Sequence, residues 1–139
     1  MLEIPSKLRA VVRRRLKEEY FVWMTTVGSD LTPQPRPVWF VWQNDSFLIY
    51  SQPKAHKVHQ LQEHPRVALH FNADATADQD VLVFLGEARI DLEAPPVHKN
   101  RLYVAKYRDG ITGLNSSPEQ MAREYSTAIR VTPTAVRGW

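Results

Sequence analysis

Apolar side chains recur at two different periods along this chain, and the two periods predict a mixture of strands and short helices. One stripe of apolar residues has the spacing of a helix face and leaves the nearby basic run on a solvated face: Leu8, Val11, Val12 and Leu16. Aromatic and β-branched residues dominate five later segments, each predicted to be a strand: residues 20–27, 46–50, 67–71, 81–90 and 127–132. Residues 81–90 form the longest of these, with Gly86 as a bulge. The pattern predicts a mainly β protein with flanking helices.

A further predicted strand carries prolines at the alternate positions 33, 35 and 37 and runs on through the apolar residues 38–42. Because successive N–H groups of a strand point to opposite edges, all three prolines remove donors from the same edge. Gln34, Arg36 and Val38 still donate on the other edge, so this strand pairs with one neighbour. Two interpretations remain open: an edge protected against aggregation, or a barrel split here with its backbone facing a ligand.

The segment after residue 50 predicts a short helix that breaks a local electrostatic rule. Pro53 stands at a first helical position, and Ser51 or Gln52 is placed to cap it. The N-terminus of a helix normally attracts Asp or Glu, yet in this segment no acidic residue precedes Glu63. The first two turns instead hold two lysines and two histidines: Lys54, His56, Lys57 and His59. Free backbone N–H groups, a capping hydroxyl and two lysines make a phosphate or carboxylate site. The alternative is a set of solvated lysines on a surface helix.

Helical spacing returns near the C-terminus. A Pro-Pro pair opens a helix over residues 95–107. The residues predicted to pack inward are Val97, Leu102, Tyr103 and Ala105, and those predicted to face solvent are Lys99, Arg101 and Lys106. Residues 108–116 contain two glycines and are predicted to be a loop. A Ser-Pro-Glu-Gln capping box then opens a second short helix.

Composition narrows the class of protein. A chain of 139 residues with 43% hydrophobic residues has the size of one globular domain, so residues 1–139 are treated as a single domain. No apolar run approaches the roughly 20 residues that span a membrane, and the chain has no cysteine. We therefore expect a cytoplasmic protein without a membrane partner. The net charge of +3 favours anionic ligands, but no nucleic-acid motif accompanies it, so no nucleic-acid partner is expected.

Histidine and serine spacing suggests two other chemistries, and neither is well supported. His56, His59 and His64 lie close in sequence, but no carboxylate or cysteine nearby completes a metal shell. No serine occupies a glycine-flanked elbow of the kind that carries a nucleophile. We expect neither a metal site nor a Ser-His-Asp triad.

Several of these segments, in this order, resemble the pyridoxamine 5'-phosphate oxidase-like, flavin-binding split-barrel superfamily. Residues 57–71, KVHQLQEHPRVALHF, resemble its lysine, helix, NPRV turn and apolar strand without a gap. Upstream, RPVWF at residues 36–40, the Asn-Asp hairpin at residues 44–45 and the Ser-Gln pair at residues 51–52 match its arginine-led strand, turn and phosphate-contacting pair. The resemblance runs from about residue 21 to residue 88. It implies a six-stranded antiparallel split β-barrel of Greek-key type that forms a homodimer, with the cofactor at the subunit interface.

The resemblance also implies roles for particular residues. The cofactor phosphate is expected to contact one group of side chains: Ser51, Gln52, Lys54, His56 and Lys57. The cofactor ring is expected to lie along one stretch of backbone, with added charge from its first residue: Arg36, Pro37, Val38 and Trp39. The protein then supplies position and electrostatics while the ring transfers electrons.

Two departures from the family pattern bear on the activity. Val81 and Val83 stand where the oxidase that names the family has glutamine and arginine, and its longer C-terminal portion is missing after Trp139. Pyridoxamine phosphate oxidation is therefore not expected, and the sequence resembles more closely the branch that uses the deazaflavin coenzyme F420. We expect an F420-dependent or FMN-dependent reductase of a small conjugated substrate, with F420 favoured. The alternatives are a carrier that binds the cofactor without turnover and a haem-handling protein, for which a ligand such as His70 is needed.

Overall fold

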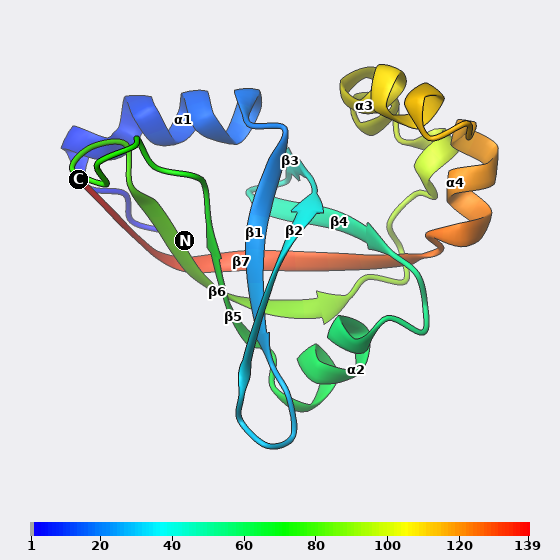
Figure 1. Cartoon of the computed structure of the whole chain (residues 1–139), viewed down its shortest axis with the longest axis horizontal. Helices are drawn as coiled ribbons and strands as arrows, with labels where there is room; N and C mark the ends of the chain where they lie inside the picture. Colours follow the sequence, from blue (N-terminus) through cyan, green and yellow to red (C-terminus); the bar gives the residue numbers. More distant parts are fainter. Residues whose placement is uncertain (1) are drawn as a thin grey trace.

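The computed structural model describes residues 2–139 and shows one seven-stranded antiparallel sheet that curls into a half-barrel (Figure 1). The strands are β1 (Phe21–Val27), β2 (Pro33–Trp39), β3 (Val41–Gln43), β4 (Ser46–Ser51), β5 (Arg66–His70), β6 (Leu82–Ile90) and β7 (Thr127–Gly138). The helices are α1 (Arg9–Glu18), α2 (His56–Glu63), α3 (Arg101–Gly113) and α4 (Pro118–Glu124), with short 3-10 turns η1 (Ser6–Leu8) and η2 (Val97–Lys99). The order across the sheet is β2-β1-β5-β6-β7-β4-β3. The predicted class, a mainly β split barrel with flanking helices, is confirmed.

The predicted count of six strands is wrong, because the expected continuous strand through residues 38–42 breaks at Phe40. The Phe40 N–H donates to the Tyr107 hydroxyl over 2.8 Å, and the Phe40 carbonyl lies 2.8 Å from the same hydroxyl. Phe40 itself is buried, so these backbone groups need partners, and a side chain provides them. As a result β2 pairs with β1 and β3 pairs with β4, on opposite sides of the break.

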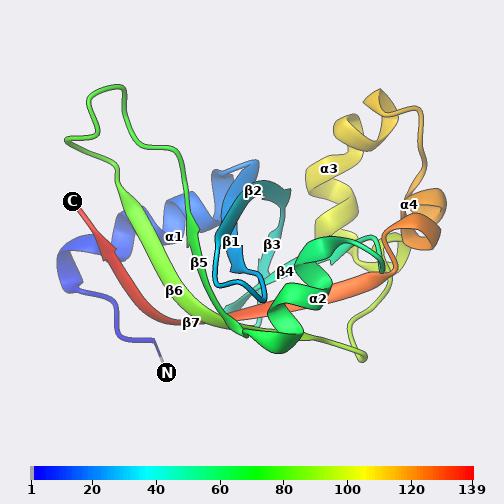
Figure 2. The ribbon, with the colours of Figure 1, turned by 60° about the horizontal axis from the view of Figure 1, so that its bottom comes forward.

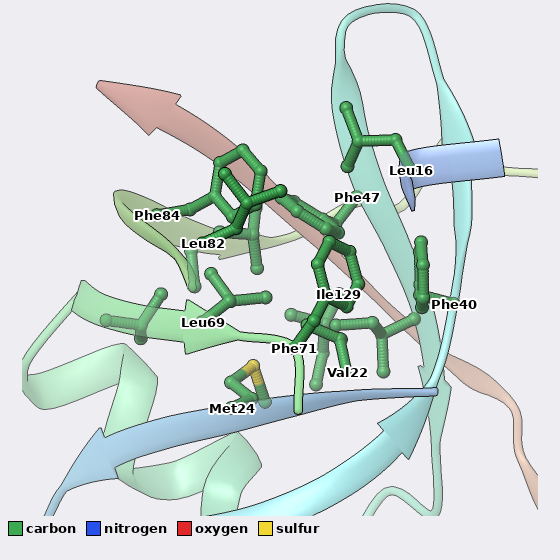
Figure 3. Close-up of a cluster of buried hydrophobic side chains, with 14 of the residues drawn as sticks. Leu16, Val22, Met24, Phe40, Phe47, Leu69, Phe71, Leu82, Phe84 and Ile129 are labelled. Carbon is green, nitrogen blue, oxygen red and sulfur yellow. The ribbon is translucent and has the colours of Figure 1, made fainter. Parts of the chain in front are cut away.

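The main hydrophobic core lies inside the curl of the sheet (Figure 3). β1 contributes Val22 and Met24, the central strands contribute Phe84 and Ile129, and α1 inserts Leu16. Burial of one such side chain contributes about 1.5–3 kcal/mol. The apolar stripe predicted for the first helix thus covers one end of the half-barrel.

A second cluster lies on the other face of β3 and β4, under α3 and α4. Tyr103, Tyr107 and Ile111 recur every four residues of α3 and are buried. They rotate the helix so that Leu102 is 49% exposed and Lys106 is half-buried, which reverses the predicted facing of both residues, and Ala105 is also exposed. α3 also begins six residues later than predicted and continues to Gly113 through the expected loop.

Two further predictions concern the long strands and the basic run. Gly86 does mark a bulge, since the β6–β7 register shifts there and a Cβ on Gly86 would lie 2.6 Å from the Thr132 carbonyl oxygen. β7 is the longest strand with 12 residues against 9 in β6, contrary to expectation. Unlike its exposed neighbours in the basic run, Arg15 is buried. Its side chain donates to the backbone carbonyls of Asn72 and Asp80.

Candidate functional site

The start of α2 retains its electrostatic anomaly, although the helix does not begin where predicted. The Ala55 N–H donates to the Gln52 carbonyl over 3.1 Å, so Pro53 lies in a turn and the helix begins at His56. No side chain caps the helix, and its first turn contains no acidic residue. The first N–H groups of α2 therefore have no capping side chain, and their partial positive charge is not offset by a neighbouring carboxylate.

α2 is fixed against the sheet beside the β1–β2 hairpin (Figure 2). The Thr26 hydroxyl donates to the Gln60 side-chain oxygen over 2.5 Å, and Thr26 is fully buried. In the register of β1 and β2, Met24 faces Arg36, and directly paired residues lie on the same side of a sheet. The side chain of Arg36 therefore lies on the same face as Met24 and Thr26, which is the face that α2 packs against.

Arg36 and Lys57, called here the cation pair, are both half-buried. Burial lowers the pKa of Lys57, and the positive charge of Arg36 lowers this pKa further. Burial also lowers the pKa of Arg36. Within residues 2–139, neither side chain forms a salt bridge with a carboxylate. Two partly desolvated cations that repel each other favour an anion between them, because an anion replaces the repulsion by charge-assisted hydrogen bonds.

The remaining residues expected at the phosphate border the start of α2. Ser51 ends β4 and is buried, with its hydroxyl donating to the Gln52 carbonyl over 3.0 Å. Gln52, Lys54 and His56 are exposed. Chain continuity keeps these residues beside the start of α2, while only the β1–β2 register places Arg36 on the side of the sheet that α2 covers.

The residues expected along the cofactor ring lie on β2, at one edge of the sheet. Within the described chain β2 pairs only with β1, so the edge with the three prolines is unpaired, as the sequence predicts. Pro37 is exposed and Val38 is half-buried. The Trp39 ring stacks on Tyr107 with centroids 4.4 Å apart and planes at 2°, so one face of the indole is already covered.

Tyr107 supports the edge strand, a role that its sequence context did not predict. Its hydroxyl lies 2.7 Å from the Tyr20 carbonyl as well as contacting Phe40, so α3 holds the ends of β1 and β2 together. The available signal was the four-residue spacing of Tyr103, Tyr107 and Ile111, which identifies the buried face of α3.

No group of three or more histidine, cysteine or carboxylate side chains within residues 2–139 is arranged to hold a metal ion. In the same residues, no helix combines the length and the apolar character needed to cross a membrane.

The curled sheet, its split edge and the cation pair define a split-barrel protein with a candidate anion site. A family model described as pyridoxamine 5'-phosphate oxidase matches residues 8–139, so this chain belongs to that family. The superfamily resemblance inferred from the sequence is thereby confirmed. No curated protein matches the chain.

Solved structures repeat the fold over nearly the whole chain. A conserved hypothetical protein, Rv2991 from Mycobacterium tuberculosis, is 19% identical with a TM-score of 0.76 and covers 99% of this chain and 85% of its own. A protein named F420 reductase is 20% identical with a TM-score of 0.68, covering 96% and 98%. HutZ, the heme storage protein from Vibrio cholerae, is 14% identical with a TM-score of 0.65, covering 94% of both chains. At these identities the likeness shows the fold alone.

Proposed function

We propose that this chain binds the phosphate of a flavin-type cofactor, FMN or coenzyme F420, at the cation pair and acts as a reductase of a small conjugated substrate. The observation that carries the proposal is the pair itself: Arg36 and Lys57 are half-buried, close enough to repel, and without a carboxylate partner among the described residues. Family membership and a structural neighbour named F420 reductase support the choice of cofactor.

The residues present fit a phosphate group. Lys57 and Arg36 supply two charges, and the uncapped start of α2 supplies backbone N–H groups. Ser51, Gln52, Lys54 and His56 lie at or next to the start of α2 along the chain, and in this proposal the ring lies along the backbone of residues 36–39. The bound cofactor supplies hydride transfer to or from the substrate. The chain contributes binding, orientation and positive charge, so no acid–base pair is required of it.

The proposed site lies at an unpaired edge, which leads us to propose a homodimer. The outer edge of β2 offers the carbonyls of its three prolines and no donors from those positions. A second copy that covers this edge with side chains would exclude water from the ring and complete the pocket. The small substrate would then enter between the two subunits.

An absorbance experiment tests the cofactor assignment. Purified protein is titrated with FMN, F420 and haemin, with inorganic phosphate as competitor. We expect saturable binding of FMN or F420 that phosphate weakens. The reduced cofactor is then mixed with a quinone such as menadione, and its oxidation distinguishes a reductase from a carrier. Absence of saturable binding by both FMN and F420 would refute the proposal.

The haemin titration addresses a different outcome. His70 is half-buried, and its ring stacks on Trp23 with centroids 6.2 Å apart and planes at 9°. Its Nδ1 contacts the Phe71 carbonyl at 3.3 Å, which leaves Nε2 as the nitrogen for a ligand. A haemin spectrum that is lost in His70→Ala but kept in Lys57→Ala would replace the flavin proposal by a haem-handling function.

A further inference from the structure

A second hollow lies away from the cation pair, between α1, β3 and α3. Its volume is about 290 Å³, which is near the lower end of the range for small-molecule sites. In Figure 1, α1 and α3 both lie at the top of the view, and β3 lies between them. None of the residues that line it belongs to the proposed cofactor site.

Apolar side chains form one part of the lining. Trp42 and Val41 come from β3, Leu16 from α1 and Leu102 from α3. Trp42 is half-buried and packs edge-on against Phe47, with centroids 5.1 Å apart. Leu102 is 49% exposed, so the core leaves much of its surface uncovered. These walls suit a small apolar body of one or two rings.

Cationic side chains form the other part. Arg13 and Lys17 are four residues apart on α1 and therefore lie on one face of it. Lys106 enters from α3, four residues after Leu102 and on the same face. None of the three cations forms a salt bridge within residues 2–139. Three positive charges thus meet an apolar wall, and no carboxylate within residues 2–139 forms a salt bridge with them.

Lys106 is the best positioned of the three. Its ammonium donates to the Phe40 carbonyl over 2.8 Å and lies 3.8 Å from the centroid of the Phe40 ring, which fixes the side chain. An ammonium has three donors, and within residues 2–139 this is the only hydrogen bond that Lys106 makes through its side chain. Burial lowers the pKa of Lys106 to about 8, although the charge of Glu19 acts in the opposite direction.

We propose that this hollow is a binding site for a small organic acid, with its carboxylate at Lys106, Arg13 and Lys17 and its apolar body against Trp42 and Leu102. The site is independent of the proposed cofactor site. The site selects ligands that carry both an apolar ring and a carboxylate, because the apolar wall contacts the ring and the three cations contact the carboxylate.

The test uses 2-naphthoate as the probe and quenching of tryptophan fluorescence, with calorimetry as a second readout. Wild-type protein should bind 2-naphthoate saturably, and Lys106→Met should weaken binding by about tenfold or more, the effect of losing one charge-assisted hydrogen bond. Lys99→Met is the matched control, because Lys99 is an exposed lysine close in sequence that does not line the hollow. The neutral analogue 2-naphthamide should bind weakly and equally to wild type and Lys106→Met.

A second variant keeps the test decisive if Lys106→Met alters the fold. Leu102→Glu changes an exposed side chain and places a negative charge in the hollow, so it should remove 2-naphthoate binding and leave the melting temperature unchanged. Three results would each overturn the proposal: no saturable binding up to the solubility limit of the acid, equal affinity in Lys106→Met and Lys99→Met, or loss of binding in Lys57→Ala, which would place the probe at the cation pair.

Discussion

Two kinds of half-buried or buried cation exist in this molecule, and they differ in what surrounds them. Arg130 donates to the Asp91 carboxylate over 2.9 Å, to the Ser46 hydroxyl over 3.1 Å and to a backbone carbonyl. Arg15 likewise contacts the Glu19 carboxylate at 2.7 Å and two backbone carbonyls. The cation pair, Arg36 and Lys57, has no carboxylate partner among the described residues.

The difference separates structural charge from charge available for binding. A buried cation with a full set of acceptors stabilises the fold, and its removal leaves those acceptors unpaired. A partly desolvated cation without an acceptor costs stability and is compensated only when a ligand arrives. The four predictions below test this contrast, from the largest expected effect to the smallest.

Arg130→Met should cause the largest loss of stability. The side chain of Asp91 is only 10% exposed, and the substitution removes the closer and more buried of the two cations beside its carboxylate, leaving only the exposed Arg89 at 3.7 Å. The free energy of unfolding should fall by about 3–5 kcal/mol, the usual effect of breaking a buried pair. Urea denaturation followed by circular dichroism measures this.

The control for this pair is Arg89→Met. Arg89 is 64% exposed and lies 3.7 Å from the same carboxylate, so its loss should change the unfolding free energy by less than about 1 kcal/mol. Burial alone would raise the pKa of Asp91, but the hydrogen bond from Arg130 and further contacts lower it overall. Stability from this carboxylate is therefore present above its ordinary pKa and is lost as pH falls through the lowered one. Arg130→Met should remove that acid-side dependence, and an unchanged acid profile would contradict this account.

Arg15→Met should lower the unfolding free energy by about 1.5–3 kcal/mol, the range for hydrogen bonds to a charged group. Its two carbonyl acceptors flank the loop of residues 72–80, so amide hydrogen exchange in that loop should also accelerate. Arg14→Met, at an exposed neighbouring position, should change neither quantity. Equal effects from the two variants would show that helix charge, rather than the contacts of Arg15, sets the stability.

Lys57→Ala should weaken binding of FMN or F420 by about 1.5–3 kcal/mol, because one charge-assisted hydrogen bond to the phosphate is lost. Lys57 forms no salt bridge within residues 2–139, so the substitution should not lower the free energy of unfolding by removing one. Fluorescence or absorbance titration of the cofactor measures the first quantity. Lys99→Ala is the matched control, because Lys99 is exposed and lies outside the proposed cofactor site, and it should retain full affinity. Unchanged affinity in Lys57→Ala would remove Lys57 from the phosphate site.

Arg36→Gln should raise the pKa of Lys57 toward its ordinary value, and this is the smallest expected effect. Burial is the main reason for the low pKa and remains, while the repulsion from Arg36 is removed. NMR titration of the lysine side chain measures the change. In the wild-type protein, between the lowered pKa of Lys57 and 10.5, the unfolded state binds more protons than the folded state. The free energy of unfolding therefore rises with pH over this range. Arg36→Gln should make this rise smaller. A Lys57 pKa that does not move would show that the two cations are not coupled.

The sequence predicted those features that depend on local rules. Alternating prolines remove donors from one strand edge whatever the fold, and β2 is indeed an edge strand. Glycine at position 86 marks the β6–β7 bulge for a similarly local reason. Among the site residues, Ser51 to Lys57 are neighbours in sequence, so their common location follows from chain continuity alone.

Other features depend on contacts between distant residues and were not predictable in this way. Pro53 suits the second position of a turn as well as the first position of a helix, and the Gln52–Ala55 hydrogen bond decides for the turn. The carbonyl partners of Arg15 lie 57 and 65 residues further along the chain. The rotation of α3 is set by Tyr103, which packs edge-on against Tyr50, and by Tyr107, which stacks on Trp39. The half-buried position of Lys106 therefore could not be predicted from its own segment.

The Tyr107 hydroxyl gives the molecule a mechanical property. This single oxygen lies within 2.8 Å of backbone atoms of Tyr20 and Phe40, at the ends of two different strands, while its ring belongs to α3. The helix cannot tilt away from the sheet without breaking a buried contact at the junction of β2 and β3. Helix and edge strand therefore behave as one stiff unit, and small displacements of the two move together rather than independently.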